Sequence, residues 1–181
     1  MVNISLYHTL VFDFDGVFTN NYVVVNEFGE ESVQVSRADG LAVDLLRRTS
    51  KLGLHSLDIF ILSSEKNSVV EARARKMSIE CIQGTRDKQT TLDSRFRMTR
   101  TSDPNPYRGL IYFGNDLNDL IVMQKAGLSF CPSDAHVRVK AVSTHVLRNR
   151  GGHNFVREGV ELLLNVEGLS SEELCEYISD S

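Results

Sequence analysis

Two aspartates, Asp13 and Asp15, stand at the end of an apolar run in the segment LVFDFDGVFT, residues 10–19. A buried, ionised carboxylate is costly unless a cation or hydrogen-bond donors compensate it. Two such acids suit phosphoryl transfer. One carboxylate attacks phosphorus, the other moves protons, and a divalent cation held by oxygen ligands screens the approach of anion to anion. The rest of the chain has to supply that compensation.

Polar residues also follow the other predicted strands. Because the carboxyl ends of parallel strands meet at one edge of an open sheet, we expect these side chains to gather there with the two aspartates. A hydroxyl and a lysine would hold phosphate oxygens, and an acid and amide cluster would hold a cation. The residues are Ser63 and Ser64, Lys88 at the start of a helix, and Asn115, Asp116 and Asp119.

Strand-like and helical runs alternate along the chain, which predicts a parallel sheet with helices on both faces. Asp39 is expected to cap the first helix, and Ser170 and Glu173 form a capping-box pattern. A hairpin with Gly29 in its turn is expected from strands at 22–25 and 32–35. Other strands are expected at 9–14, 57–62, 79–82, 110–113, 128–131 and 144–147, and helices at 67–77, 88–98, 117–125 and 134–141, with two more near the end.

Composition narrows the class of protein. The 181 residues are 41% hydrophobic and 24% charged, which is typical of one globular domain, here expected to span 1–181. A net charge of −4 and the lack of a long basic face argue against a nucleic-acid partner. Three widely spaced cysteines, no signal-peptide pattern and no long apolar run predict a cytoplasmic protein without a membrane span.

The motif DFDGVFT, with Ser63, Lys88 and the segment GNDLND at 114–119, resembles the four ordered motifs of the haloacid dehalogenase (HAD) superfamily. The segments DGVFTN, ILSSEKN and GGHNFVRE are similar to the 3-deoxy-manno-octulosonate 8-phosphate phosphatase group. That group includes 2-keto-3-deoxynononate 9-phosphate phosphatases and the phosphatase-like domains of acylneuraminate cytidylyltransferases. The resemblance implies a three-layer, Rossmann-like α/β fold.

The resemblance also implies roles for individual residues. Asp13 would be the nucleophile and Asp15 the general acid and base, while Lys88 would neutralise phosphate and orient Asp13. Phosphate would also contact Ser63, Ser64 and Gly16. Mg²⁺ would lie between the Asp13 carboxylate, the Asp15 backbone carbonyl and the Asn115 side chain, with Asp116 acting through water. Asp119 would fix Lys88 or the metal's water shell, or would only cap a helix.

Three departures from the group affect these expectations. Asn115 stands where the phosphatases usually carry aspartate, which predicts weaker Mg²⁺ binding. Glu65 and Lys76 resemble the nononate branch and would bear on sugar recognition, or would be an ordinary helix-start glutamate and a solvated lysine. Arg37 is separated from Asp39 by Ala38, whereas the octulosonate group tends to have the arginine directly before the aspartate; it could still reach a substrate carboxylate, because a guanidinium makes bidentate pairs with carboxylates. Arg157 is also expected near the substrate.

The spacing of the motifs leaves no room for a cap domain. By the resemblance, a homotetramer covers the site, with the hairpin at about 21–35 packed against its copies. The tail, about 150–181, would lie over a site or begin with a glycine hinge. The expected substrate is a phosphorylated 2-keto-3-deoxy sugar acid. The alternative is a catalytically weak or inactive tetramerisation module linked to an acylneuraminate cytidylyltransferase. A receiver-type phospho-acceptor domain fits less well, because it lacks such a first strand.

Overall fold

The computed structural model describes residues 2–179 and contains a six-stranded parallel sheet in the order β5-β4-β1-β6-β7-β8. The order places β1 in the middle, between β4 and β6, so its carboxyl end is flanked on both sides. The predicted three-layer α/β fold is confirmed. The strands are β1 Thr9–Phe12, β4 Asp58–Leu62, β5 Glu80–Ile82, β6 Leu110–Phe113, β7 Leu128–Cys131 and β8 His145–Val146.

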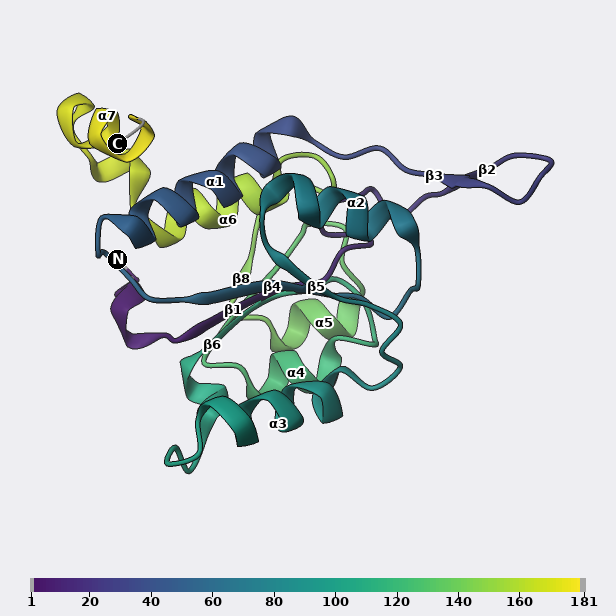
Figure 1. Cartoon of the computed structure of the whole chain (residues 1–181), viewed down its shortest axis with the longest axis horizontal. Coiled ribbons are helices and arrows are strands. Elements are labelled where there is room, and N and C mark those ends of the chain that lie inside the picture. The colour runs from purple at the N-terminus through teal and green to yellow at the C-terminus, as the bar shows by residue number, and fades with distance from the viewer. Residues whose placement is uncertain (1, 180–181) are drawn as a thin grey trace.

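Helices cover both faces of the sheet (Figure 1). One face carries α1 Arg37–Lys51, α2 Ser68–Met77 and α6 Phe155–Leu163; the other carries α3 Lys88–Thr99, α4 Leu120–Lys125 and α5 Val137–Val142. The last helix, α7 Ser171–Ile178, packs against α1 and begins with the predicted capping box. Short 3-10 turns occupy Ile4–Leu6, Pro106–Gly109 and Val166–Gly168. No helix in the described part of the chain is long and apolar enough to span a membrane.

The central strand β1 is buried along its whole length and contributes side chains to two hydrophobic clusters. Leu10 and Phe12 belong to the cluster beneath α1 and α6, while Val11 belongs to the cluster beneath α3, α4 and α5. Successive side chains of a strand point to opposite faces, so a strand covered on both sides reads as a continuous apolar run. This burial fixes the end of β1 and the aspartates that follow it.

The hairpin is shorter than predicted, since only β2 Val24–Val25 and β3 Glu31–Ser32 pair as strands within residues 2–179. Its turn is held by Asn26, whose backbone N–H donates to the carbonyl of Glu30, and by Gly29 at φ +78°. The hairpin extends away from the body of the molecule (Figure 1). Its two strands form a sheet of their own and do not pair with a strand of the central sheet. Its apolar side chains are exposed: Tyr22, Val23, Val24, Val25 and Phe28.

The predicted cap of α1 by Asp39 is wrong. The cap is Ser36, whose hydroxyl accepts hydrogen bonds from the backbone N–H groups of Ala38 and Asp39. The Asp39 side chain is fully buried, and its Oδ1 accepts from the backbone N–H of Arg157, 2.9 Å away at the start of α6. Asp39 therefore joins two helices that lie side by side, a contact that no local sequence pattern signals.

Asp39 is expected to make the protein's stability depend on pH. Burial raises the pKa of this carboxyl from 3.8 to about 6, although the Arg157 N–H and the Arg73 charge oppose the rise. Between about pH 4 and 6 the folded state then holds a proton that the unfolded state has lost, so stability falls as pH rises. The fall is about 1.4 kcal/mol per pH unit across this window.

The variant Asp39→Asn should remove this part of the pH dependence, because its amide does not titrate. Urea unfolding at pH 4, 5 and 6 measures the slope, and Asp44→Asn, which removes a partly exposed carboxylate of the same helix, is the matched control. Equal slopes in wild type and Asp39→Asn would contradict the assignment.

Candidate active site

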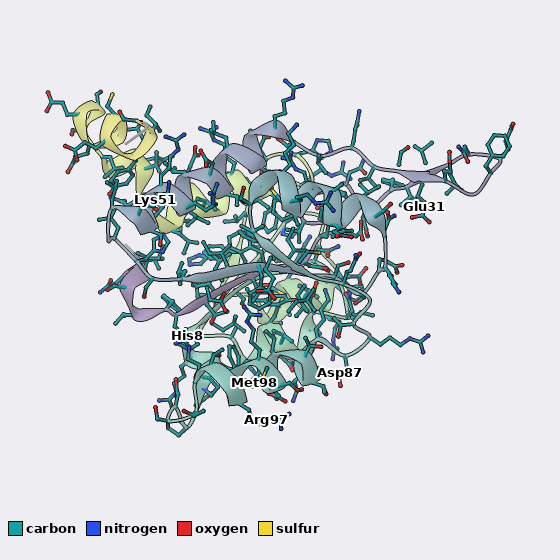
Figure 2. The ribbon with its side chains drawn as sticks, in the orientation of Figure 1. His8, Glu31, Lys51, Asp87, Arg97 and Met98 are labelled. Carbon is teal, nitrogen blue, oxygen red and sulfur yellow. The ribbon has the colours of Figure 1, made fainter. Side chains whose placement is uncertain are left out.

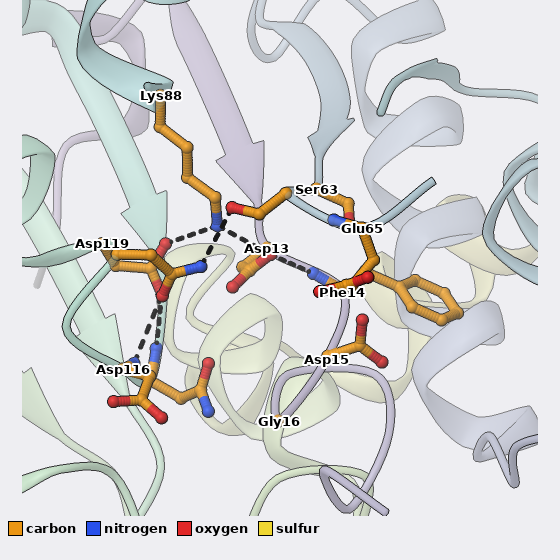
Figure 3. A network of polar contacts seen from close by, with 12 residues as sticks. Asp13, Phe14, Asp15, Gly16, Ser63, Glu65, Lys88, Asp116 and Asp119 are labelled. Carbon is orange, nitrogen blue, oxygen red and sulfur yellow. Dashed lines mark hydrogen bonds and ion pairs between the residues drawn. The ribbon is translucent and has the colours of Figure 1, made fainter. Parts of the chain in front are cut away.

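A pocket of about 570 Å³ lies where β1, β4 and β6 end, at their carboxyl edge. Side chains from the strand ends form its inner wall, as a close view of the polar network shows (Figure 3). The hairpin and the start of α2 supply the outer wall. The lining residues that the sequence predicted for the site are Asp13, Asp15, Ser63, Ser64, Glu65, Asn115 and Asp116.

Asp13 follows β1 directly and is 4% exposed. Its Oδ1 accepts from the backbone N–H of Phe14 at 2.8 Å and contacts the Lys88 ammonium at 2.8 Å. Within residues 2–179, Oδ2 has no hydrogen-bond partner. Burial and the nearby Asp119 raise the pKa of Asp13 to about 8, against the opposing effect of Lys88. The geometry leaves one oxygen of a buried carboxylate open toward the pocket.

Lys88 is buried at the start of α3 and joins two carboxylates. Its Nζ lies 2.8 Å from Asp13 Oδ1 and 2.7 Å from Asp119 Oδ1. Burial works to lower the pKa of Lys88, but the charges of Asp13 and Asp119 outweigh it and raise that pKa. The ammonium group is therefore held charged and aimed at Asp13.

Asp119 organises the loop after β6. Its Oδ1 also accepts from the Tyr112 hydroxyl at 2.8 Å, and its Oδ2 accepts from the backbone N–H of Asn115 at 2.9 Å. Its side chain makes no capping hydrogen bond to α4, so the helix-cap alternative is wrong. Of the predicted alternatives, the contacts agree with the one in which Asp119 fixes Lys88.

Asp15 lies two residues beyond Asp13 on the loop that turns away from β1. Burial is the main cause that raises its pKa, and the charge of Glu65 adds to it. The Thr19 hydroxyl donates to Asp15 Oδ1 at 3.4 Å and accepts from the backbone N–H of Gly16 at 3.1 Å. Thr19 was not among the predicted site residues, although it stands in the same motif. A raised pKa favours a protonated Asp15, which a general acid needs.

Asn115 and Gly16 pack tightly against each other. Gly16 has φ +75°, and a Cβ on it would lie 1.9 Å from Asn115 Nδ2. Asn115 Oδ1 is buried and has no hydrogen-bond partner in the described part of the chain, which is costly for an amide oxygen. A cation beside Asp13 would satisfy this oxygen. The donor set of a carboxylate, an amide and the Asp15 backbone carbonyl suits Mg²⁺.

Among residues 2–179, no three His, Cys, Asp or Glu side chains gather in a group that would hold a metal ion. A cation at this place therefore depends on the Asn115 amide and on a backbone carbonyl as well as on Asp13.

The loop after β4 faces Asp13 across the pocket. Ser63 is 1% exposed, and its Oγ accepts from the backbone N–H of Glu65 at 3.2 Å. The Ser64 hydroxyl accepts from Asn118 Nδ2 at 3.1 Å, which ties this loop to the loop after β6. Asn118 was missed in the sequence, because only the fold brings it opposite Ser64.

Comparison with known proteins identifies the family to which the chain belongs. It is 30% identical to the 3-deoxy-D-manno-octulosonate 8-phosphate phosphatase KdsC of Yersinia pestis over 156 residues, 86% of this chain and 78% of the relative. It is 28% identical to the KdsC of Escherichia coli K12 over 164 residues, 90% and 82% of the two chains. This chain belongs to the KdsC-like family of HAD phosphatases. No family model matches it.

Solved structures agree with this KdsC-like assignment. A HAD family hydrolase from Streptomyces avermitilis superposes with a TM-score of 0.81 at 30% identity, covering 92% of this chain and 96% of that one. The 3-deoxy-D-manno-octulosonate 8-phosphate phosphatase of Moraxella catarrhalis superposes with a TM-score of 0.78 at 25% identity, covering 90% and 88%. That structure contains a magnesium ion, a phosphate ion and a KDO molecule.

The predicted substrate residues of this KdsC-like chain are not all near the pocket. Glu65 lines it, whereas Arg37 and Lys76 are exposed elsewhere and Arg157 pairs with Glu161 at 2.6 Å. Arg157 lines a different hollow, between α1, α6 and α7. In the described part of the chain, no arginine or lysine lines the pocket. Roles for Arg37, Lys76 and Arg157 stay predictions, and they require a contact from another subunit or a movement.

The first glycines of the tail lie behind the catalytic loop of this HAD phosphatase. The backbone N–H of Gly152 donates to the Val17 carbonyl at 3.0 Å. A Cβ on Gly151 would lie 2.1 Å from the Gly16 carbonyl oxygen. The two glycines therefore allow close backbone packing that supports the motif of Asp13 and Asp15.

Proposed function

We propose that the chain is a Mg²⁺-dependent phosphatase that hydrolyses a phosphorylated 2-keto-3-deoxy sugar acid, an octulosonate 8-phosphate or a nonulosonate 9-phosphate. The observation that carries the proposal is the Asp13–Lys88–Asp119 network, which leaves Asp13 Oδ2 open at the pocket while Lys88 holds Oδ1. The KdsC relatives and the Moraxella complex support the class of substrate.

The reaction proceeds in two steps on this chain's own residues. Asp13 Oδ2 attacks phosphorus, the bond from phosphorus to the sugar oxygen breaks, and Asp15 gives its proton to that oxygen. Asp15 then takes a proton from water as the water oxygen attacks the aspartyl-phosphate. Inorganic phosphate leaves and the Asp13 carboxylate is restored. Ser63 and Lys88 hold phosphate oxygens during both steps.

Asp13, the Asp15 carbonyl and Asn115 would hold Mg²⁺, with Asp116 contributing through water. When bound, the cation supplies positive charge beside the phosphate and favours the ionised form of Asp13. This charge would oppose burial and the Asp119 charge, which raise the pKa of Asp13 to about 8.

The experiment that tests the function is phosphate release with and without Mg²⁺ from a panel of substrates. The panel contains 3-deoxy-manno-octulosonate 8-phosphate, 2-keto-3-deoxynononate 9-phosphate and N-acetylneuraminate 9-phosphate. We expect Mg²⁺-dependent turnover of one of them. No release from any of them, by a well-folded protein, would contradict the proposal.

Asn115 is the observation that favours the second candidate, a catalytically weak or inactive tetramerisation module associated with an acylneuraminate cytidylyltransferase. The variant Asn115→Asp replaces a neutral ligand with a negatively charged one. We therefore expect its apparent Mg²⁺ affinity, measured in phosphate release, to rise by about tenfold. Asn115→Ser, which removes the amide oxygen, is the control. An Asn115→Asp protein that stays inactive with every substrate would favour the module.

A homotetramer is part of the proposal, as is a cytoplasmic location in sugar-acid biosynthesis. The support for assembly is the exposed apolar surface of the hairpin, which includes Val24 at 70% and Phe28 at 80% exposure. An isolated exposed hairpin of this composition is an unstable arrangement unless another chain covers it. A neighbouring subunit would also supply a cation for the substrate carboxylate.

A further inference from the structure

The outer wall of the pocket is built from two segments that are distant in the sequence. The base of the hairpin supplies Asn21, Val23, Glu31 and Val33, and the start of α2 supplies Asn67, Val69 and Val70. The reacting groups Asp13 and Asp15 lie on the inner wall. The leaving group of a phosphoester bound at Asp13 therefore lies between the reacting groups and this outer wall.

One side-chain hydrogen bond joins the two segments. Asn67 Nδ2 donates to Glu31 Oε2 at 2.6 Å, across 36 positions of sequence. Within residues 2–179, it is the one hydrogen bond that links residues 23–35 to the rest of the molecule. Figure 2 labels Glu31 on β3, where the hairpin leaves the body. The position of this arm relative to α2 therefore depends on that bond and on the packing of Val33 and Val35.

Asn67 is itself held firmly. It caps α2, since its Oδ1 accepts from the backbone N–H of Val69 at 2.9 Å. Its own backbone N–H donates to Gln83 Oε1 at 3.0 Å. Because the cap uses Oδ1, the Nδ2 group is left to point at the hairpin. Asparagine thus performs two tasks here that serine or aspartate, which are also good caps, would not combine.

We propose that the Glu31–Asn67 hydrogen bond positions the hairpin base as the wall that receives the leaving group, and so favours large phosphoesters over small ones. The inference rests on the proposed function for its substrate, and it adds Glu31 and Asn67 as positioning residues. They act on binding of the leaving group, whereas Asp13 and Asp15 act on the phosphorus.

The variant Asn67→Ser keeps a helix cap and a neutral charge but has no group that reaches Glu31. We expect kcat/KM for the sugar-acid phosphate to fall about ten- to a hundredfold, through KM, as the loss of one hydrogen bond to a charged group implies. The fall with p-nitrophenyl phosphate, whose leaving group is small, should be clearly less. Amide hydrogen exchange of residues 23–35 should become faster in the same variant without any substrate.

Exchanging the hydrogen-bond donor and acceptor between positions 31 and 67 should restore the bond. Asn67→Asp keeps the cap but places a carboxylate against Glu31, so its defect should exceed that of Asn67→Ser. Adding Glu31→Gln reverses donor and acceptor, because the new amide donates to the carboxylate introduced at position 67. The double variant should recover selectivity and slow exchange of the hairpin.

The outcomes separate the two proposals. Equal losses on both substrates, with hairpin exchange unchanged, would overturn the positioning role. A double variant of Asn67→Asp and Glu31→Gln that recovers neither substrate selectivity nor slow hairpin exchange would also overturn the positioning role. A wild-type protein inactive on every phosphoester would overturn the proposed function and the selectivity with it, while hydrogen exchange would still decide whether the bond holds the hairpin.

Discussion

Replacing Asp13 with asparagine is expected to abolish phosphate release, by on the order of 10⁴-fold or more, while the protein stays folded. The amide oxygen can still accept from the backbone N–H of Phe14, 2.8 Å from Asp13 Oδ1 in the wild type. It is a poor nucleophile and forms no aspartyl-phosphate. Burial raises the pKa of Asp13, which means that the site disfavours the ionised form, so a neutral isostere should not weaken the fold.

Two measurements on the same preparations test this prediction. Phosphate release gives the turnover, and a thermal melt shows that the variant is folded. Asp44→Asn, which removes a carboxylate that pairs with Arg47 and Arg48 on α1 outside the pocket, is the control for loss of an acid elsewhere in the protein. If Asp13→Asn and Asp44→Asn turned over equally, Asp13 would not be the nucleophile.

Much of the fold and of the inner wall follows from the sequence, because both depend on local patterns. A continuous apolar run such as that of β1 signals a strand covered on both faces, and its end places Asp13 at the sheet edge. Lys88 was predicted at a helix start, where it lies.

The outer wall was not predictable in the same way. Its contacts, Glu31 with Asn67 and Ser64 with Asn118, join segments that only the folded chain brings together. The wrong prediction that Asp39 caps α1 has the same cause. The local capping pattern suggested that role, but the Asp39 side chain accepts from the backbone N–H of Arg157 in another helix. Residues that touch through the fold carry little signal in one sequence.

Replacing Lys88 with methionine is expected to remove activity and to lower the free energy of unfolding by about 3–5 kcal/mol at neutral pH. Lys88 is 2% exposed, and its ammonium group is the cation that contacts Asp13 and Asp119. Methionine fills a similar volume, so the loss comes mainly from two buried carboxylates left without their cation. Turnover should fall because Asp13 loses its orientation and phosphate loses a donor.

The pH dependence of this loss identifies its cause. Burial and the Asp119 charge already raise the pKa of Asp13, and Lys88 opposes them, so without Lys88 that pKa would rise further and folding would favour the protonated form of Asp13. Because Asp13 titrates near pH 8 in the wild type and at a higher pH without Lys88, the stability deficit of Lys88→Met should be smaller at pH 7 than at pH 9 in urea unfolding. Adding Asp119→Asn should restore part of the stability at pH 7 but not the turnover. A deficit that is the same at both pH values, and unchanged by Asp119→Asn, would mean that Lys88 stabilises the fold by packing rather than by its charge.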